Sequence, residues 1–248
     1  MKYLKAVLVG LTQGLTEFLP VSSSGHLAVL ARLSVAPTSV FYCLALHLAT
    51  LAAVLIVLRR EVWQVVRHPV KGDAKYVLIA SAPTVAVAFL FKKFWPELLT
   101  GRLLGFGFLL TSAVLFCAER LKKAGSGSLD TKISLLTGLM QGVAVLPGVS
   151  RSGCTIAAAR FCGVDPDRAT RFSFLLSVPV IVGGFLLEGV ESGFSTVGAD
   201  ASEVITAAVA AFISGLLAVR FMLAKTKKGL MSFVPYTFLM GVLCYFLP

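Results

Sequence analysis

Glu17, Ser23 and His26 lie close together in the segment GLTQGLTEFLPVSSSGH, which begins at Gly10. A serine hydroxyl can act as a nucleophile, and a histidine three residues on can serve as its base or protonate the leaving group. A carboxylate among apolar residues can hold a divalent cation or relay a proton. Arg151, further along the chain, carries a fork of N–H donors that suits phosphate oxygens. These residue types indicate chemistry on phosphorus.

The chain contains this segment twice. Gly10–Gly25 aligns with Gly138–Gly153 at an offset of 128 residues without a gap, and eight of the sixteen positions are identical. A duplicated scaffold needs the same glycines and helix caps in both copies, whereas chemistry needs the copies to differ. Three differences introduce an ionisable or reactive group: Glu17 aligns with Val145, Ser23 with Arg151, and His26 with Cys154. We therefore predict that the catalytic residues are Glu17, Ser23, His26 and Arg151.

Both copies also carry serines and a glycine where a second, short helix is expected to begin. Serine is a good N-cap, and a helix N-terminus offers free N–H groups with a partial positive charge. Two such termini that meet at one point would bind one anion between them. The residues predicted to bind phosphate there are Ser22, Ser24, Gly25, Ser150, Ser152 and Gly153.

Two further side chains are candidates for the same site. Gln13 lies one helical turn before Glu17, so both point the same way, and we predict that a divalent cation binds Glu17 with help from Gln13. His47 lies in the middle of an apolar run. It either lines the cavity or bonds a neighbouring helix.

The composition is that of an integral membrane protein. Hydrophobic residues make up 57% of the 248 residues and charged residues only 14%, with a mean hydropathy of +0.87. Soluble domains carry far more charge to cover their surface. The net charge of +11 therefore indicates loop charge or attraction to anionic lipid, and we predict no nucleic-acid partner. The five cysteines are odd in number and scattered, which favours packing roles over disulfides.

Six apolar runs are long enough to approach a membrane span. When 128 is added to the bounds of the first three, the results fall on the last three, so the duplication covers the whole chain, with halves 1–128 and 129–248. The predicted spans are Val40–Leu58, Tyr76–Phe91, Leu103–Ala118, Phe172–Leu187, Val204–Val219 and Phe233–Leu247.

The duplicated segments themselves are broken by glycine and proline. Each has a longer arm and a shorter arm, Leu4–Leu19 with Leu27–Leu33 and Ile133–Leu146 with Thr155–Cys162. Sixteen helical residues reach about 24 Å, short of a hydrocarbon core of roughly 30 Å. We predict an all-α fold in which each half is a re-entrant helix–turn–helix plus three spans. The alternative is an ordinary span with an external loop.

Three spans between the copies would insert the second half upside down. Paired interrupted segments in inverted halves point to a buried binding site near the middle of the membrane. Under this topology, sixteen of the 23 basic residues lie on the face opposite the N-terminus, and six lie on the N-terminal face. The positive-inside rule then places both termini outside the cytoplasm.

At these residues the sequence resembles the undecaprenyl-diphosphatase family, also called bacitracin-resistance proteins. The motif [E/Q]GxxEFLPVSSxGH is matched from Gln13 to His26, and PGxSRSGxT is matched from Pro147 to Thr155. The resemblance covers the whole chain, including RFSFLLSVPVI from Arg171. Many family members carry Glu where this chain has Gln13, which leaves Glu17 as the main anionic ligand for a cation.

The resemblance implies a phosphatase of the bacterial plasma membrane. It would remove the terminal phosphate of a C55 polyprenyl diphosphate, recycling the lipid carrier of cell-wall synthesis, with Mg²⁺ or Ca²⁺ as cofactor. It also adds Thr155 to the predicted phosphate ligands. The expected partners are the lipid substrate, membrane lipids and a second copy in a homodimer, with the site open to the outer side.

Several alternatives stay open at this point. Either Ser23 or an activated water attacks phosphorus, because the sequence does not separate the two routes. A transporter or flippase could use the same anion site. The SSGH run is also similar to part of the acid-phosphatase-like lipid class, but the histidine expected after the downstream Ser-Arg is missing, so we reject that class.

Overall fold

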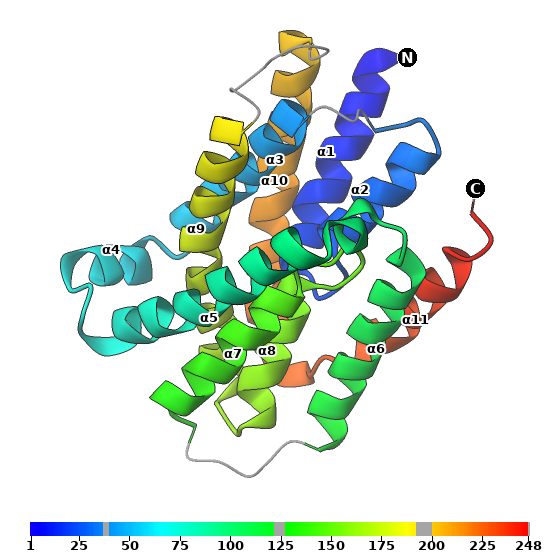
Figure 1. Ribbon diagram of the computed structural model, residues 1–248. Coiled ribbons are helices and arrows are strands. Elements are labelled where there is room, and N and C mark those ends of the chain that lie inside the picture. Colours follow the sequence, from blue (N-terminus) through cyan, green and yellow to red (C-terminus); the bar gives the residue numbers. More distant parts are fainter. Residues whose placement is uncertain (37–39, 122–126, 192–199, 248) are drawn as a thin grey trace.

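The computed structural model describes residues 1–36, 40–121, 127–191 and 200–247. Within these ranges the regular structure is helical, apart from one isolated bridge between Gly127 and Val164 (Figure 1). The all-α prediction is confirmed. In chain order the helices are α1 Lys2–Phe18, α2 Ser23–Arg32, α3 Val40–Val57, α4 Arg59–Arg67, α5 Gly72–Phe94, α6 Leu104–Arg120, α7 Thr131–Val143, α8 Arg151–Phe161, α9 Pro166–Glu191, α10 Ala201–Lys225 and α11 Val234–Leu243, with short 3₁₀ turns at Pro96–Thr100, Thr226–Lys228 and Met231–Phe233.

Both duplicated segments are broken where the sequence predicts. The break between α1 and α2 contains Pro20, and the break between α7 and α8 contains Pro147, each of which lacks the N–H that a continuing helix needs. Ser22 and Ser150 then cap the second helices, since their hydroxyls accept from the N–H groups of Gly25 and Gly153 at 3.2 and 3.1 Å. The predicted serine N-caps are confirmed.

Three helices are long and apolar enough to cross a membrane, judged by length and composition: Gly72–Phe94, Pro166–Glu191 and Ala201–Lys228. Helices α3 and α4 would make a fourth such span if they are counted together, although their axes are bent by 90° at the break between them. The other two predicted spans lie on shorter helices, α6 with 17 residues and α11 with 10. Six full spans therefore stay a prediction.

Helix α4 was not predicted. Residues 59–75 lie between two predicted spans, and nine of them form a helix nearly perpendicular to α3. Its Val62 and Val65 pack against the core, whereas Arg60 and Arg67 are exposed. This spacing places the valines on one face and the arginines on another, which is enough to hold a surface helix.

The two halves of the chain pack crosswise. Helix α1 of the first half lies along α10 of the second, and α7 of the second half lies along α5 of the first (Figure 1). A glycine permits each close approach: a Cβ on Gly10 would lie 2.2 Å from the carbonyl oxygen of Ala207, and one on Gly138 would lie 2.1 Å from that of Ala80. Gly10 and Gly138 occupy the same position of the repeat, so the two copies make the same contact.

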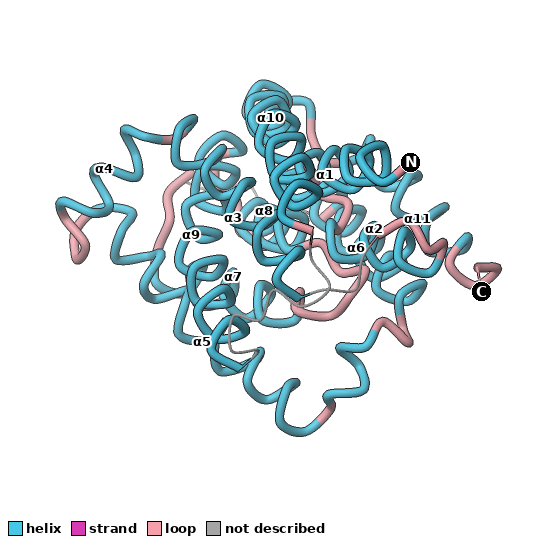
Figure 2. Tube along the Cα trace, turned by 90° about the horizontal axis from the view of Figure 1, so that it is seen from above, coloured by secondary structure: helices cyan, strands magenta, loops and turns pink. Residues whose placement is uncertain are grey.

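Helix α8 lies in the middle of the bundle (Figure 2). All of its residues from Ser152 to Arg160 are buried, and its one buried charge, Arg160, pairs with Glu119 at 2.9 Å. The main core around it includes Phe18 of α1 and Phe174 of α9, whose rings meet edge to face with centroids 5.3 Å apart. This packing fixes the start of α8 relative to the end of α1.

The glycine contact predicts the cost of adding one methyl group. Gly138→Ala should destabilise the fold by about 1–3 kcal/mol, because the new Cβ overlaps a backbone carbonyl that cannot move aside freely. Gly183→Ala in α9 is the matched control, since its Cβ would meet open space and alanine favours helix by about 1 kcal/mol. Thermal unfolding in detergent measures both. Equal melting temperatures would show that the α5–α7 contact is not tight.

Candidate functional site

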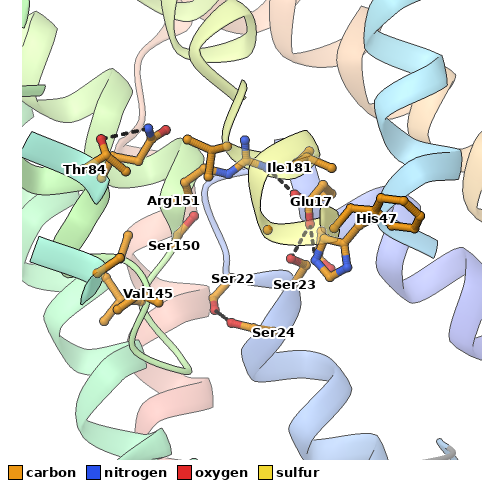
Figure 3. Close-up of a pocket in the computed structure, with 18 of the residues that line it drawn as sticks. Glu17, Ser22, Ser23, Ser24, His47, Thr84, Val145, Ser150, Arg151 and Ile181 are labelled. Atoms are coloured by element: carbon orange, nitrogen blue, oxygen red, sulfur yellow. Dashed lines mark hydrogen bonds and ion pairs between the residues drawn. The ribbon is translucent and has the colours of Figure 1, made fainter. Parts of the chain in front are cut away.

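Glu17, at the end of α1, is the centre of the site (Figure 3). Its carboxylate is buried and contacts the guanidinium of Arg151 through Oε1. Its Oε2 accepts from the hydroxyl of Ser23 at 2.5 Å and from the amide of Gln13 at 2.9 Å. The Nε2 atom of His47 lies 3.8 Å from the same oxygen. Three side chains from other helices and one from its own helix therefore surround this carboxylate.

The two broken segments meet at this carboxylate. Ser23 is the first residue of α2 and Arg151 the first residue of α8, so both helix N-termini approach Glu17. The first turn of a helix leaves its N–H groups without intrahelical acceptors. The predicted convergence of the two N-termini is thus present in the structure. This convergence brings the guanidinium of Arg151, serine hydroxyls and backbone N–H groups to one point. Together they are the donors that an oxyanion such as phosphate needs.

A pocket of about 260 Å³ opens beside this cluster. Its polar end holds Glu17, Ser23, His47 and Arg151, which Figure 3 shows grouped together. Its other walls are largely apolar and come from α3, α5, α9 and the segment after α7. They include Leu44, Ala88, Val145, Val149, Val180, Ile181, Gly184 and Phe185. The pocket therefore suits a molecule with an anionic head and an apolar body.

The predicted phosphate ligands divide into two groups. Ser22, Ser24 and Ser150 line the pocket. Ser152 and Thr155 are turned elsewhere: the Ser152 hydroxyl donates to the carbonyl of Leu19 at 2.9 Å, and the Thr155 hydroxyl lies 2.6 Å from that of Ser173. These two bonds tie α8 to its neighbours. The direct phosphate contact predicted for Ser152 and Thr155 does not agree with where their hydroxyls point.

The two predicted glycines serve the packing of the helix starts. A Cβ on Gly25 would lie 2.6 Å from the ring of Phe108, and one on Gly153 would lie 3.0 Å from the side chain of Ser150. Their N–H groups are taken by the capping serines. Both glycines thus allow the helix starts to pack closely, while the N–H groups before them stay available to a ligand.

His26 is not placed as the base of Ser23. Its Nδ1 atom lies 2.6 Å from the carbonyl oxygen of Ser22, and its Nε2 atom lies 2.5 Å from the hydroxyl of Tyr236. Both ring nitrogens are thereby occupied, and the hydroxyl of Ser23 bonds Glu17 instead. The reason is the helix: Ser23 and His26 share α2, but the histidine ring turns back to the capping turn and outward to α11. The structure therefore does not pair Ser23 with His26.

Gln13 was predicted as a cation ligand, and its surroundings fit that role. Its Oε1 atom is buried without a hydrogen-bond partner among the described residues, while its amide nitrogen bonds Glu17. An unpartnered buried oxygen beside a carboxylate is a suitable donor pair for Mg²⁺ or Ca²⁺. No group of three or more His, Cys, Asp or Glu side chains in the described ranges could hold a metal by itself. The donors therefore fit a cation that takes its other ligands from water and substrate.

Some lining residues were missed by the sequence reasoning. Thr84 of α5 accepts from the amide of Gln141 at 3.1 Å, and Glu188 of α9 lies at the edge of the pocket. Gln141 could have been found, because it is the counterpart of Gln13 in the second copy. Nothing local marks Thr84 or Glu188. His47, for which two roles were open, lines the pocket and also bonds the carbonyl of Cys43 at 2.8 Å.

Comparison with known proteins gives a consistent result. The family model described as bacitracin resistance protein BacA matches residues 6–243. A curated relative named undecaprenyl-diphosphatase, from Carboxydothermus hydrogenoformans, is 36% identical over 98% of this chain and 96% of its own length. Relatives with the same name from Korarchaeum cryptofilum and Christiangramia forsetii are 32% and 35% identical, over 95% and 98% of this chain and 95% and 97% of their own lengths.

The buried Glu17–Arg151 pair predicts an asymmetry between single and double variants. Glu17→Gln should destabilise the protein by about 3 kcal/mol, because it leaves the guanidinium without its counter-charge. Adding Arg151→Met to this variant should recover most of the loss, since no unpaired charge then remains. Glu188→Gln, at the exposed edge of the same pocket, is the control and should change stability by less than about 0.5 kcal/mol. Thermal unfolding in detergent measures all three, and additive losses in the double variant would contradict the pairing.

Proposed function

This chain belongs to the bacitracin resistance protein family, and from its site we propose that it is a membrane phosphatase. Its substrate is a polyprenyl diphosphate, the C55 undecaprenyl form by the names of its relatives, and its products are the monophosphate and inorganic phosphate. This reaction recycles the lipid carrier of cell-wall synthesis and underlies resistance to bacitracin. The observation that carries the proposal is the meeting of Arg151, Ser23 and Glu17 at the polar end of an otherwise apolar pocket.

Substrate binding and activation are coupled through Arg151. In the structure its guanidinium pairs with Glu17, which neutralises the carboxylate electrostatically. A diphosphate carries more negative charge than one carboxylate and accepts the arginine fork through two oxygens, so it competes for Arg151. When Arg151 turns to the phosphate, Oε1 of Glu17 is released from the guanidinium, while Oε2 keeps its bond to the hydroxyl of Ser23. The hydroxyls of Ser22, Ser24 and Ser150 and the free N–H groups of both helix starts complete the phosphate cradle.

The proton of Ser23 then has a defined destination. Its hydroxyl donates to Glu17 at 2.5 Å, so Glu17 takes the proton as Oγ attacks the terminal phosphorus. The bond from that phosphorus to the bridging oxygen breaks, and polyprenyl monophosphate leaves with the bonding electrons. Water then hydrolyses the phosphoserine to phosphate and restores Ser23. In the second route, water bound beside Glu17 attacks phosphorus directly and Ser23 only orients it.

A divalent cation supports either route. Gln13 and Glu17 would hold it, and it would offset the negative charge of the diphosphate during transfer. The protein's own contribution is to hold both helix starts against the phosphate. Because the donors come from α1, α2 and α8, a shift of any of these helices would disturb the cradle.

The membrane arrangement proposed for this multi-pass protein is an inverted repeat of halves 1–128 and 129–248. The crosswise packing supports it, since Gly10 and Gly138 make equivalent contacts with the opposite half. Each broken segment then enters and leaves the membrane by the same face, and both termini lie outside the cytoplasm of a bacterial cell, with the site open to the outer side. The excess of basic residues on the opposite face supports this orientation. The homodimer stays a prediction.

A transporter or flippase with the same anion site is not favoured. Such a protein needs the guanidinium and the helix starts, but it does not need a serine hydroxyl bonded to a buried carboxylate. The relatives are named for hydrolysis of a diphosphate. A fold with repeated broken helices is compatible with both functions, so the chemistry of the site decides between them.

Phosphate release from polyprenyl diphosphate by purified protein in detergent tests the function. With Mg²⁺ or Ca²⁺ present, the wild type should release phosphate, and Arg151→Lys should lower kcat/KM about 100-fold, because lysine keeps the charge but loses the bidentate fork. Ser23→Ala should lose turnover by a similar factor if the serine is the nucleophile. Arg220→Lys, an exposed arginine on α10, is the control. Headgroup binding without phosphate release under any divalent cation would favour the transporter instead.

The apolar end of the pocket predicts where the lipid chain lies. Gly183 and Gly184 are neighbours on α9, and a Cβ on either would meet open space, but only Gly184 lines the pocket. Gly184→Leu should raise KM for a C55 diphosphate about tenfold, equivalent to ~1.4 kcal/mol, by filling the space the chain needs. It should affect a short-chain diphosphate less, and Gly183→Leu should affect neither. Equal effects of the two variants on both chain lengths would rule out this path.

A further inference from the structure

Tyr236 contacts His26 although 210 residues separate them in the chain. Its hydroxyl lies 2.5 Å from Nε2 of the histidine. The two rings are nearly parallel, with centroids 5.7 Å apart and 3° between their planes, and Phe108 meets the histidine edge-on at 5.3 Å. Neither Tyr236 nor His26 lines the pocket beside Glu17. The link from this pair to the pocket runs through the backbone, since His26 bonds the carbonyl of Ser22.

The hydrogen bonds determine which nitrogen of His26 carries the proton. Its Nδ1 atom faces the carbonyl oxygen of Ser22 at 2.6 Å, and a carbonyl only accepts, so Nδ1 must donate. In the neutral ring Nε2 is then an acceptor, and the hydroxyl of Tyr236 donates to it. The result is a chain of two hydrogen bonds, from Tyr236 through His26 to Ser22, that satisfies both ring nitrogens.

The residue at the end of this chain has an unusual backbone. Ser22 has φ 69° and ψ 98°, a conformation in the left-handed half of the map that side chains other than glycine rarely adopt. Such a backbone conformation is strained and persists only where its surroundings hold it. Its carbonyl accepts from the backbone N–H of His26 at 3.2 Å as well as from Nδ1, and its hydroxyl caps α2.

This turn sets the position of the reacting hydroxyl. Ser23 follows Ser22 directly, begins α2 and bonds Glu17 at 2.5 Å. The equivalent turn of the second copy provides a comparison: Ser150 has φ −79° and ψ 115°, ordinary extended backbone, and Cys154 stands where His26 stands in the first copy. The strained cap and the histidine occur in the same copy, which is also the copy that carries the reacting serine.

We propose that Tyr236 is a positioning residue that acts through His26: its hydroxyl fixes the ring tautomer that holds the carbonyl of Ser22 and thereby aims Ser23 at Glu17. The inference rests on the proposed phosphatase function. It gives His26 a role at the site without making it the base of Ser23. It also gives α11, the last helix of the second half, a part in shaping the reactive turn of the first.

Tyr236→Phe tests this role while keeping the ring that stacks on His26. We expect kcat for polyprenyl diphosphate to fall between about ten- and a hundredfold, because the nucleophile is less well aimed. KM should change by less than about twofold, since Arg151 and the start of α8, which Tyr236 does not contact, keep their contacts with the phosphate. Tyr245→Phe, a more exposed tyrosine nine residues on in the chain, is the matched control and should leave both constants unchanged. Wild-type kcat in Tyr236→Phe would overturn the proposal.

The ring nitrogens of His26 give a second measurement that does not depend on turnover. The chain has three histidines, so ¹⁵N spectra of protein labelled at the histidine rings can be assigned with His47→Gln and His68→Gln. We expect the wild type to show Nδ1–H for His26, and Tyr236→Phe to shift the Nε2 signal. An Nε2–H tautomer, or no shift in the variant, would overturn the contact. If the wild type released no phosphate, the proposed function would fail, and these spectra would still test the contact between Tyr236 and His26.

Discussion

The rest of this structure depends on one buried ion pair. Glu17 and Arg151 lie in a protein with few charges, where each alone would be costly to bury. They belong to different halves of the chain, so the pair forms only where the two halves meet. The pair therefore requires the break after α1 and the break before α8 to meet. Where they meet, the starts of α2 and α8 and their serines lie beside the pocket.

Hydrogen bonds from polar side chains that do not line the pocket hold the two breaks together. Ser152 of α8 donates to the carbonyl at the end of α1, and Thr111 of α6 bonds both the carbonyl of Gly148 and the N–H of Ser150. Backbone groups at a break have lost their helical partners, and in a membrane no water is at hand to replace them. The polar residues around the site thus have two roles. Some face the pocket, and others form hydrogen bonds with the backbone groups at the two breaks.

The sequence alone determined the helical fold, the positions of both breaks and the serines that cap the second helices. These features follow from local rules: proline removes a donor, serine accepts from the next turn, and apolar runs favour helix where charge is scarce. It also singled out Glu17, Ser23 and Arg151, because these are positions at which the two copies of the repeat differ. It did not reveal α4, because the charged residues there obscured the spacing of Val62 and Val65.

Only the tertiary structure decided which of these residues touch. Ser23 and His26 are three residues apart, yet their partners are Glu17 and Tyr236, on α1 and α11. Thr84 and Glu188 joined the pocket without any local signal. The physical reason is that a side chain's neighbours depend on how helices pack, and the packing here crosses between the halves, so spacing along the chain says little about distance in space.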